Sequence, residues 1–166
     1  MDVQALFGIN VLLSFLASGV AAYLLVWPRL RVRERRDALI ALVTPHLFLR
    51  FIGISFLIPG VVSPSLPKAF AAPAAYGDLI AGVLAIGAVF ALGRRATWAI
   101  PLVWIFNVWG AADLLFAFYQ GPIGVGINVG DLGASYYIPT TIVPPMLVTH
   151  FLIFLLLLRS GGEEQK

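Results

Sequence analysis

Apolar residues occur in five long runs along this chain, and polar residues gather between the runs. The runs cover residues 6–27, 38–59, 76–92, 98–119 and 136–158, and the third run is the shortest. An α-helix rises ~1.5 Å per residue, so about 20 apolar residues match the ~30 Å hydrocarbon core of a bilayer. Because lipid offers no partner to an unpaired backbone amide, each run is predicted to form a membrane-spanning helix.

This pattern predicts an all-α fold, namely a polytopic transmembrane bundle of five helices. A single transmembrane domain would cover residues 1–166, with a short tail over 159–166. Composition agrees, since 60% of the residues are hydrophobic, 11% are charged and the mean hydropathy is +0.95. A soluble domain has about 25% charged residues, which it needs to cover its surface.

The positive charges predict the orientation of the bundle. Of the eleven Lys and Arg residues, nine fall in segments that five helices would place on one face: Arg29, Arg31, Arg33, Arg35, Arg36, Arg94, Arg95, Arg159 and Lys166. Only Lys68 falls on the other face, and Arg50 lies inside a helix. The positive-inside rule then predicts an outer N-terminus and a cytoplasmic C-terminus. We expect a multi-pass protein of a cell membrane, of the bacterial inner-membrane type.

The same charges bear on partners. The net charge of +3 follows from the topology signal, so the lipid bilayer is the expected partner and nucleic acid is not.

The chain has no cysteine, which excludes disulfides and thiolate metal sites. No spacing of nucleophile, base and orienting group is readable, so the sequence does not indicate an enzyme. The two longer outer loops, 60–75 and 120–135, are rich in proline and glycine respectively, and the second is expected to form a flexible lid.

Six polar residues interrupt the apolar runs and are the candidate ligand-binding residues. An ionisable side chain in the hydrocarbon region is costly, so it tends to face the bundle interior and to have a partner. The candidates lie on the second to fifth helices: His46, Arg50, Asp78, Asn107, Asp113 and His150.

The two histidines are predicted to lie at one depth. His46 is eight residues from the cytoplasmic end of its run, and His150 is eight residues from the end of the fifth run. Two imidazoles at one depth on different helices are typical of bis-histidine ligation of haem b, or of a small metal site. The alternative is a pair of neutral histidines that hydrogen bond to backbone carbonyls or to nearby threonines.

Arg50 lies about one helical turn outward of His46 and is predicted to form an ion pair with Asp113. The difference in depth is on the order of 5 Å, which the long arginine side chain can span. Asn107 or Tyr119 is expected to add hydrogen bonds, and Asp78 is a competing partner. The pair either holds the helix register or binds a polar group of a ligand.

These residues support three hypotheses of function. The first is a membrane protein whose buried polar centre binds a small amphipathic ligand or cofactor of haem or isoprenoid type. The second is a small transporter or proton-conducting protein, which five helices could form only as a homo-oligomer. The third is a structural or accessory subunit in which the polar residues hold the helices together.

Overall fold

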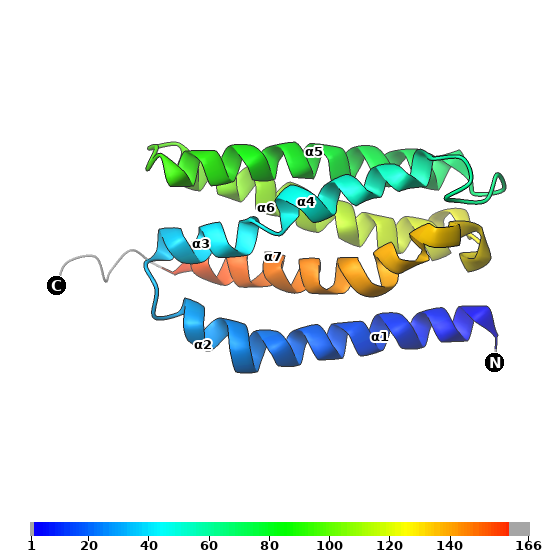
Figure 1. Cartoon of the computed structure of the whole chain (residues 1–166), viewed down its shortest axis with the longest axis horizontal. Helices are drawn as coiled ribbons and strands as arrows, with labels where there is room; N and C mark the ends of the chain where they lie inside the picture. The colour runs from blue at the N-terminus through cyan, green and yellow to red at the C-terminus, as the bar shows by residue number, and fades with distance from the viewer. Residues whose placement is uncertain (1, 160–166) are drawn as a thin grey trace.

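The computed structural model describes residues 2–159, in which helices run side by side along one long axis (Figure 1). Five helical stretches of this part are long and apolar enough to cross a membrane: Val3–Leu30, Arg35–Leu57, Lys68–Gly93, Ala99–Val125 and Ile138–Leu158. The prediction of an all-α, multi-pass membrane protein is therefore confirmed. Residues 160–166 of the predicted tail lie outside the described residues.

The first span lies at the edge of the bundle. It consists of α1 (Val3–Ala21), the π-helical turn η1 (Ala22–Val26) and α2 (Trp27–Leu30). No residue of α1 is buried, and α1 packs mainly along α7 (Figure 1). Its many exposed apolar side chains therefore form a surface that suits lipid.

The second span is broken in its middle. It consists of α3 (Arg35–Val43), α4 (His46–Leu49) and the 3-10 helix η2 (Arg50–Leu57). Pro45 causes the break between α3 and α4, because proline has no N–H to continue the helical hydrogen bonds. Directly before the break, the carbonyl of Ile40 accepts from both the backbone N–H of Thr44 at 2.9 Å and its Oγ1 at 2.7 Å. The break stands directly before His46, so the chain changes direction where the polar residues begin.

The third span begins earlier than the sequence pattern predicted. α5 covers Lys68–Gly93, although the predicted run starts at residue 76. The extra turns are rich in alanine, the strongest helix former, and Pro73 lies inside them. Pro73 leaves the carbonyl of Ala69 without its helical donor, and the side chain of Gln120 donates to that carbonyl at 3.3 Å. A hydrogen bond from the next helix thus supports the proline-containing turns.

The predicted glycine-rich lid is largely helical. The fourth span continues from α6 (Ala99–Tyr119) through the π-helical turn η3 (Gln120–Val125), which ends at Gly126 with φ 67°. The chain then forms η4 (Val129–Tyr136), η5 (Ile138–Ile142) and α7 (Val143–Leu158). Backbone hydrogen bonds join η4 to the loop after η2, from Ser63 N to Asp131 O and from Ala134 N to Val61 O, both at 2.9 Å. This segment is a packed cap, because local helical bonds and the neighbouring loop satisfy its backbone.

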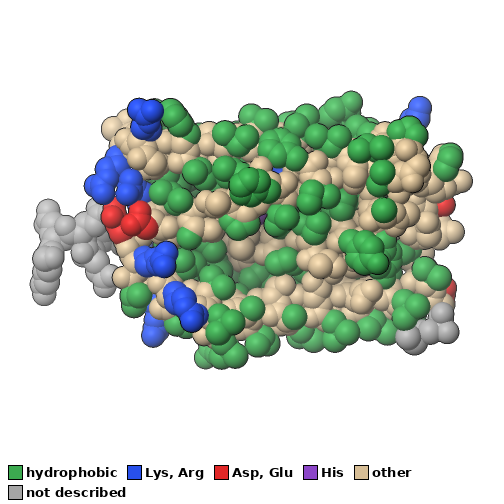
Figure 2. Space-filling model, viewed as in Figure 1, with side chains coloured by type: hydrophobic (Ala, Val, Ile, Leu, Met, Phe, Trp, Pro, Cys, Tyr) green, Lys and Arg blue, Asp and Glu red, His purple; other side chains and the backbone are tan. Residues whose placement is uncertain are grey.

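Lys and Arg side chains gather at one end of the molecule, which we call the basic end (Figure 2). It is defined by the arginines around the α2–α3 and α5–α6 turns and after α7: Arg29, Arg31, Arg33, Arg35, Arg36, Arg94, Arg95 and Arg159. Two of them also bind helix ends. Arg35 donates to the carbonyl of Leu157 at 2.8 Å, and Arg36 donates to that of Leu92 at 3.2 Å. These arginines therefore satisfy carbonyls at the C-terminal ends of α7 and α5.

The core consists of two apolar clusters, one in each half of the bundle. The cluster nearer the basic end includes Leu39, Val103 and Ile153. The cluster nearer the opposite end includes Phe70 and Leu132. Along α5, α6 and α7, the polar candidate residues stand between the residues of the two clusters. A polar layer therefore crosses the middle of the bundle.

Candidate functional site

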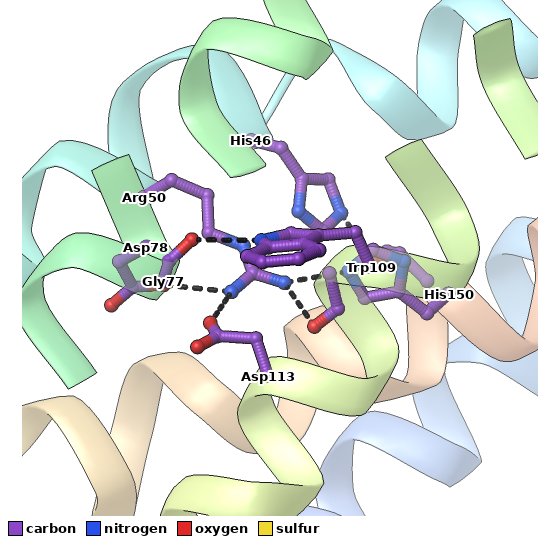
Figure 3. Close-up of polar contacts among 9 residues, drawn as sticks. His46, Arg50, Gly77, Asp78, Trp109, Asp113 and His150 are labelled. Atoms are coloured by element: carbon purple, nitrogen blue, oxygen red, sulfur yellow. Dashed lines mark hydrogen bonds and ion pairs between the residues drawn. The ribbon is translucent and has the colours of Figure 1, made fainter. Parts of the chain in front are cut away.

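Arg50 is the centre of the polar layer. It is the first residue of η2 and is fully buried. Its Nη1 donates to Asp78 Oδ1 at 2.7 Å and to Asp113 Oδ2 at 2.9 Å. Its Nη2 donates to the carbonyl of Gly110 at 2.6 Å, so the guanidinium joins η2 to both α5 and α6 (Figure 3).

The predicted ion pair between Arg50 and Asp113 is confirmed, and Asp78 joins it rather than competing with it. One guanidinium nitrogen serves both carboxylates, because the planar group carries two N–H bonds on each terminal nitrogen. The prediction that Asn107 or Tyr119 adds hydrogen bonds to this pair is wrong. The side chain of Asn107 binds His150, and Tyr119 is exposed near the end of α6.

His150 extends the network from Arg50 to Asn107. Arg50 Nη2 lies 2.8 Å from His150 Nε2. A guanidinium can only donate, so Nε2 accepts and carries no proton. His150 Nδ1 then donates to Asn107 Oδ1 at 2.7 Å, and Asn107 Nδ2 donates to the carbonyl of His150 at 3.1 Å. These directions leave His150 a neutral imidazole with one defined tautomer.

His46 takes the opposite tautomer. Its Nε2 lies 2.9 Å from Thr149 Oγ1, whose hydroxyl donates to the carbonyl of Met146 at 2.7 Å. Thr149 has a single proton to give, so its oxygen accepts from His46 Nε2. Nδ1 of His46 and Nε of Arg50 are buried without a hydrogen-bond partner among the described residues. The alternative prediction, in which threonines or backbone carbonyls pair with the histidines, is confirmed for His46, whereas the ring of His150 binds Arg50 and Asn107.

The two histidines lie at one depth, as predicted, and their rings touch. The ring centroids are 4.5 Å apart, and Phe106 packs against both rings at 5.1 and 5.2 Å. An iron or a porphyrin between them would have no room, and both Nε2 atoms already hold hydrogen bonds. Across residues 2–159 no group of three or more His, Cys, Asp or Glu is placed to hold a metal. Haem or metal ligation by His46 and His150 stays a prediction that this arrangement does not favour.

Arg50, Asp78 and Asp113 together form what we call the ion centre. Three glycines let the helices approach it closely. A Cβ atom at Gly53 would overlap the carboxylate of Asp78, and one at Gly77 would overlap that of Asp113. A Cβ at Gly110 would lie 2.8 Å from Arg50 Nη2 and 2.7 Å from Cε1 of the neighbouring imidazole. Only glycine leaves the space that these contacts occupy.

These glycines were not identified from the sequence, although two of them stand close to the candidate aspartates. Gly77 directly precedes Asp78, and Gly110 lies three residues before Asp113, about one turn away on the same helix face. Trp109 was also missed, and its Nε1 donates to the carbonyl of Gly77 at 3.2 Å. A glycine beside a buried charge is the sequence signal that was available.

The centre has more negative than positive groups. Among the described residues, Arg50 is the cation of the centre and Asp78 and Asp113 are its carboxylates. His150 is neutral because its Nε2 accepts from Arg50, and a second proton on His46 would leave a buried, charged Nδ1–H without a partner. With both carboxylates ionised, the centre carries one uncompensated negative charge. An unpaired buried charge is costly in a medium of low dielectric, so a further proton or cation stabilises this arrangement.

A cavity of about 100 Å³ begins at this centre and extends toward the end opposite the basic end. Within residues 2–159, Asp78 and Asp113 are the charged residues that line it, and Gln4 is the other polar side chain. The rest of the lining comes from apolar side chains and glycine of α1, η2, α5, α6, η3, the loop between η3 and η4, η4, η5 and α7: Phe7, Phe56, Phe70, Ala74, Leu114, Ala117, Phe118, Gly121, Pro122, Ile127, Val129, Leu132, Ile138, Pro139 and Val143. The arrangement offers carboxylate oxygens at one end of an apolar chamber.

Comparison with known proteins places this chain in a family without revealing its role. No curated protein and no solved structure matches the chain. The model of one protein family, described as a domain of unknown function (DUF8737), matches residues 6–158. This match covers the first span from residue 6 onward, the other four spans in full, and Arg50, Asp78 and Asp113. The chain therefore belongs to the DUF8737 family.

Proposed function

We propose that this protein binds a small amphipathic molecule in the cavity beside Asp78 and Asp113. The observation that carries the proposal is that two charged side chains of the ion centre line free space inside the bundle. Ion pairs that only hold helices together are best enclosed by packed side chains, because free space beside them costs packing energy. A chamber with apolar walls and a few convergent polar groups has the chemistry of a ligand site.

The proposal includes an orientation. The basic end would face the cytoplasm of a cell with a bacterial-type inner membrane, because cytoplasmic loops carry the excess of Lys and Arg. The cavity would then lie in the outer half of the membrane, near the first turns of α1 that contribute Gln4 and Phe7. A ligand would enter from the outer leaflet or from the solution outside the cell.

The same geometry supports binding more than transport. The half of the bundle toward the basic end is filled by apolar side chains that are fully buried, including Leu39, Val103 and Ile153. A proton or solute that reached the ion centre from the cavity would meet this packed layer. Transport would need a second arrangement of these helices, whereas binding needs only the arrangement described.

A cavity-filling variant tests the proposal. Ala117 lines the cavity, and Ala112 lies on the same helix with its side chain exposed on the bundle surface. Protein in nanodiscs made with native membrane lipid would be compared as wild type, Ala117→Phe and Ala112→Phe by native mass spectrometry. We expect a small organic molecule to remain on the wild type and on Ala112→Phe, and to be lost from Ala117→Phe. Equal occupancy in all three proteins would refute the proposal.

A further inference from the structure

We infer that the ligand of this cavity is an organic ammonium ion with a short apolar body, and that its binding releases one proton from the Asp78–Asp113 pair. This inference rests on the proposed function, because it assigns a charge and a chemical class to the molecule that the cavity would hold. It follows from three features of the described residues: the charge count of the centre, the composition of the cavity walls and the position of the carboxylates.

The charge count sets the sign of the ligand. Arg50 is enclosed by its four acceptors, namely two carboxylates, the carbonyl of Gly110 and His150 Nε2. It is fully buried and does not line the cavity, so no positive group is offered to an anion there. Asp78 and Asp113 do line the cavity, and together they exceed the charge of the single guanidinium. A cation is therefore the ligand that the site favours.

The cavity walls set the class of cation. A metal cation requires several oxygen ligands around it, six or more for Ca²⁺ or Mg²⁺. Here the polar side chains of the lining are the two carboxylates and Gln4, and the other lining side chains are apolar. An ammonium group needs only a few acceptors on one side, and an attached hydrocarbon body would cover the apolar walls. The site thus suits a cation that brings its own apolar surface.

The position of the carboxylates fits a head group that arrives from the cavity. Asp78 presents Oδ1 to Arg50, and Asp113 presents Oδ2 to the same nitrogen, so each carboxylate has a second oxygen that Arg50 does not use (Figure 3). The side chains of Asp78 and Asp113 are 9% and 11% exposed, and both line the cavity. An ammonium group would complete the pairing of charges at this point.

Before the ligand binds, a proton on the Asp78–Asp113 pair supplies the missing positive charge. One carboxyl group of the pair then carries an O–H bond, and the centre is neutral. When the ammonium ion binds, this O–H bond breaks and the proton passes to water, while no covalent bond forms with the ligand. Arg50 on η2 is the titratable group that contacts both carboxylates, His150 on α7 contacts Arg50, His46 on α4 binds Thr149, and α1 presents no titratable group to the cavity. The proton that the ligand displaces is therefore assigned to the Asp78–Asp113 pair.

Three probes with one hydrocarbon tail test the inference: n-hexylammonium, n-hexanol and n-hexanoate. Each would be titrated into nanodiscs that hold the wild type, Asp113→Asn, Ala117→Phe or Ala112→Phe, and bound probe would be measured by equilibrium dialysis against empty nanodiscs. Proton release would be followed with an indicator dye in weakly buffered solution. Ala117→Phe corrects for probe dissolved in lipid, and Ala112→Phe controls for the added aromatic ring.

We expect the wild type to bind n-hexylammonium at least tenfold more tightly than n-hexanol and to exclude n-hexanoate. One proton should be released for each n-hexylammonium bound. At acidic pH, where the empty pair is protonated, the affinity for n-hexylammonium should fall about tenfold for each unit by which the pH is lowered. Asp113→Asn should lose the preference for n-hexylammonium over n-hexanol and should release no proton when n-hexylammonium binds.

Each contrary result has a distinct meaning. Equal binding of n-hexanol and n-hexylammonium, both blocked by Ala117→Phe, would overturn the inference and leave the proposed function standing. Tighter binding of n-hexanoate would overturn it in the same way, since the site would then prefer an anion. If none of the three probes binds more tightly to the wild type than to the Ala117→Phe variant, the inference and the proposed function both fail.

Discussion

The backbone of Gly110 lies directly against the guanidinium group of Arg50, whose Nη2 donates to the Gly110 carbonyl at 2.6 Å. The same surface of α6 touches His150, so a Cβ at residue 110 would press on both side chains. A buried arginine in the middle of a bilayer is held here by bare helix backbone as well as by two carboxylates. Close helix approach and charge pairing are therefore two parts of one arrangement.

This contact predicts that Gly110→Ala is destabilising. The added methyl group has to displace Arg50 Nη2 or the imidazole, and overpacking of this kind costs about 1–3 kcal/mol. The free energy of unfolding would be measured by reversible denaturation in mixed micelles. Gly8→Ala is the matched control, because nothing lies within 4 Å of a Cβ at that position of α1. The prediction fails if the two variants have the same stability.

The two carboxylates predict a strongly non-additive pair of substitutions. Asp78→Asn or Asp113→Asn alone leaves one carboxylate for Arg50 and removes the excess negative charge, so each should change the free energy of unfolding by less than about 1.5 kcal/mol. The double variant leaves the arginine buried and unpaired, which should cost about 3–5 kcal/mol. A double-mutant cycle measures the difference.

The control for this cycle is Asp37→Asn at the basic end, whose side chain is 50% exposed and pairs with Arg36. An exposed ion pair contributes about 0–1 kcal/mol, so this variant should be close to the wild type. Additive effects of Asp78→Asn and Asp113→Asn would contradict the shared role of the two carboxylates.

The hydrogen-bond directions predict opposite tautomers for the two histidines. In ¹⁵N spectra of histidine-labelled protein, His150 should carry its proton on Nδ1 and His46 on Nε2, and both rings should be neutral. Thr149→Val should change the signals of His46 and leave the His150 tautomer unchanged. Asn107→Leu should leave His150 Nδ1 without an acceptor, at a cost of about 1–3 kcal/mol. A charged ring at either position would contradict the network.

An absorption spectrum tests the haem prediction. Because the two rings touch and both Nε2 atoms are engaged, we expect gently purified protein to show no Soret band, oxidised or reduced with dithionite. Added haemin should give no band that depends on the histidines. A band that disappears in both His46→Ala and His150→Ala would show that the helices separate to admit haem, and would restore that hypothesis.

Single cysteines test the proposed orientation, and the chain has no cysteine of its own. Val32 is exposed at the basic end, and Ser65 is exposed in the loop at the opposite end. In intact cells a membrane-impermeant maleimide should label Ser65→Cys and spare Val32→Cys. Inverted vesicles should give the reverse, and labelling of Val32→Cys in intact cells would contradict the orientation.

The sequence by itself determined the five spans and the identity of the buried polar residues. Both follow from local composition, because an apolar run of membrane length has to be helical and a charge inside such a run has to find a partner. The equal depth of His46 and His150 was predictable for the same reason, since depth is a matter of counting residues along a helix. The early start of α5 was not, because Pro73 lies within the extra turns, and the hydrogen bond from Gln120 to the carbonyl of Ala69 joins segments far apart in the sequence.

Only the tertiary structure decided which faces of the helices meet. Rotation about each helix axis brought Asp78 and Asp113 to one nitrogen of Arg50, turned Asn107 to His150, and left Tyr119 outside. Hydropathy does not encode such rotation, because a helix in lipid can be apolar on every side. The cavity likewise exists only where several elements fail to fill the space between them. Its place beside two carboxylates is therefore a property of the packed bundle, and no single segment of the sequence contains it.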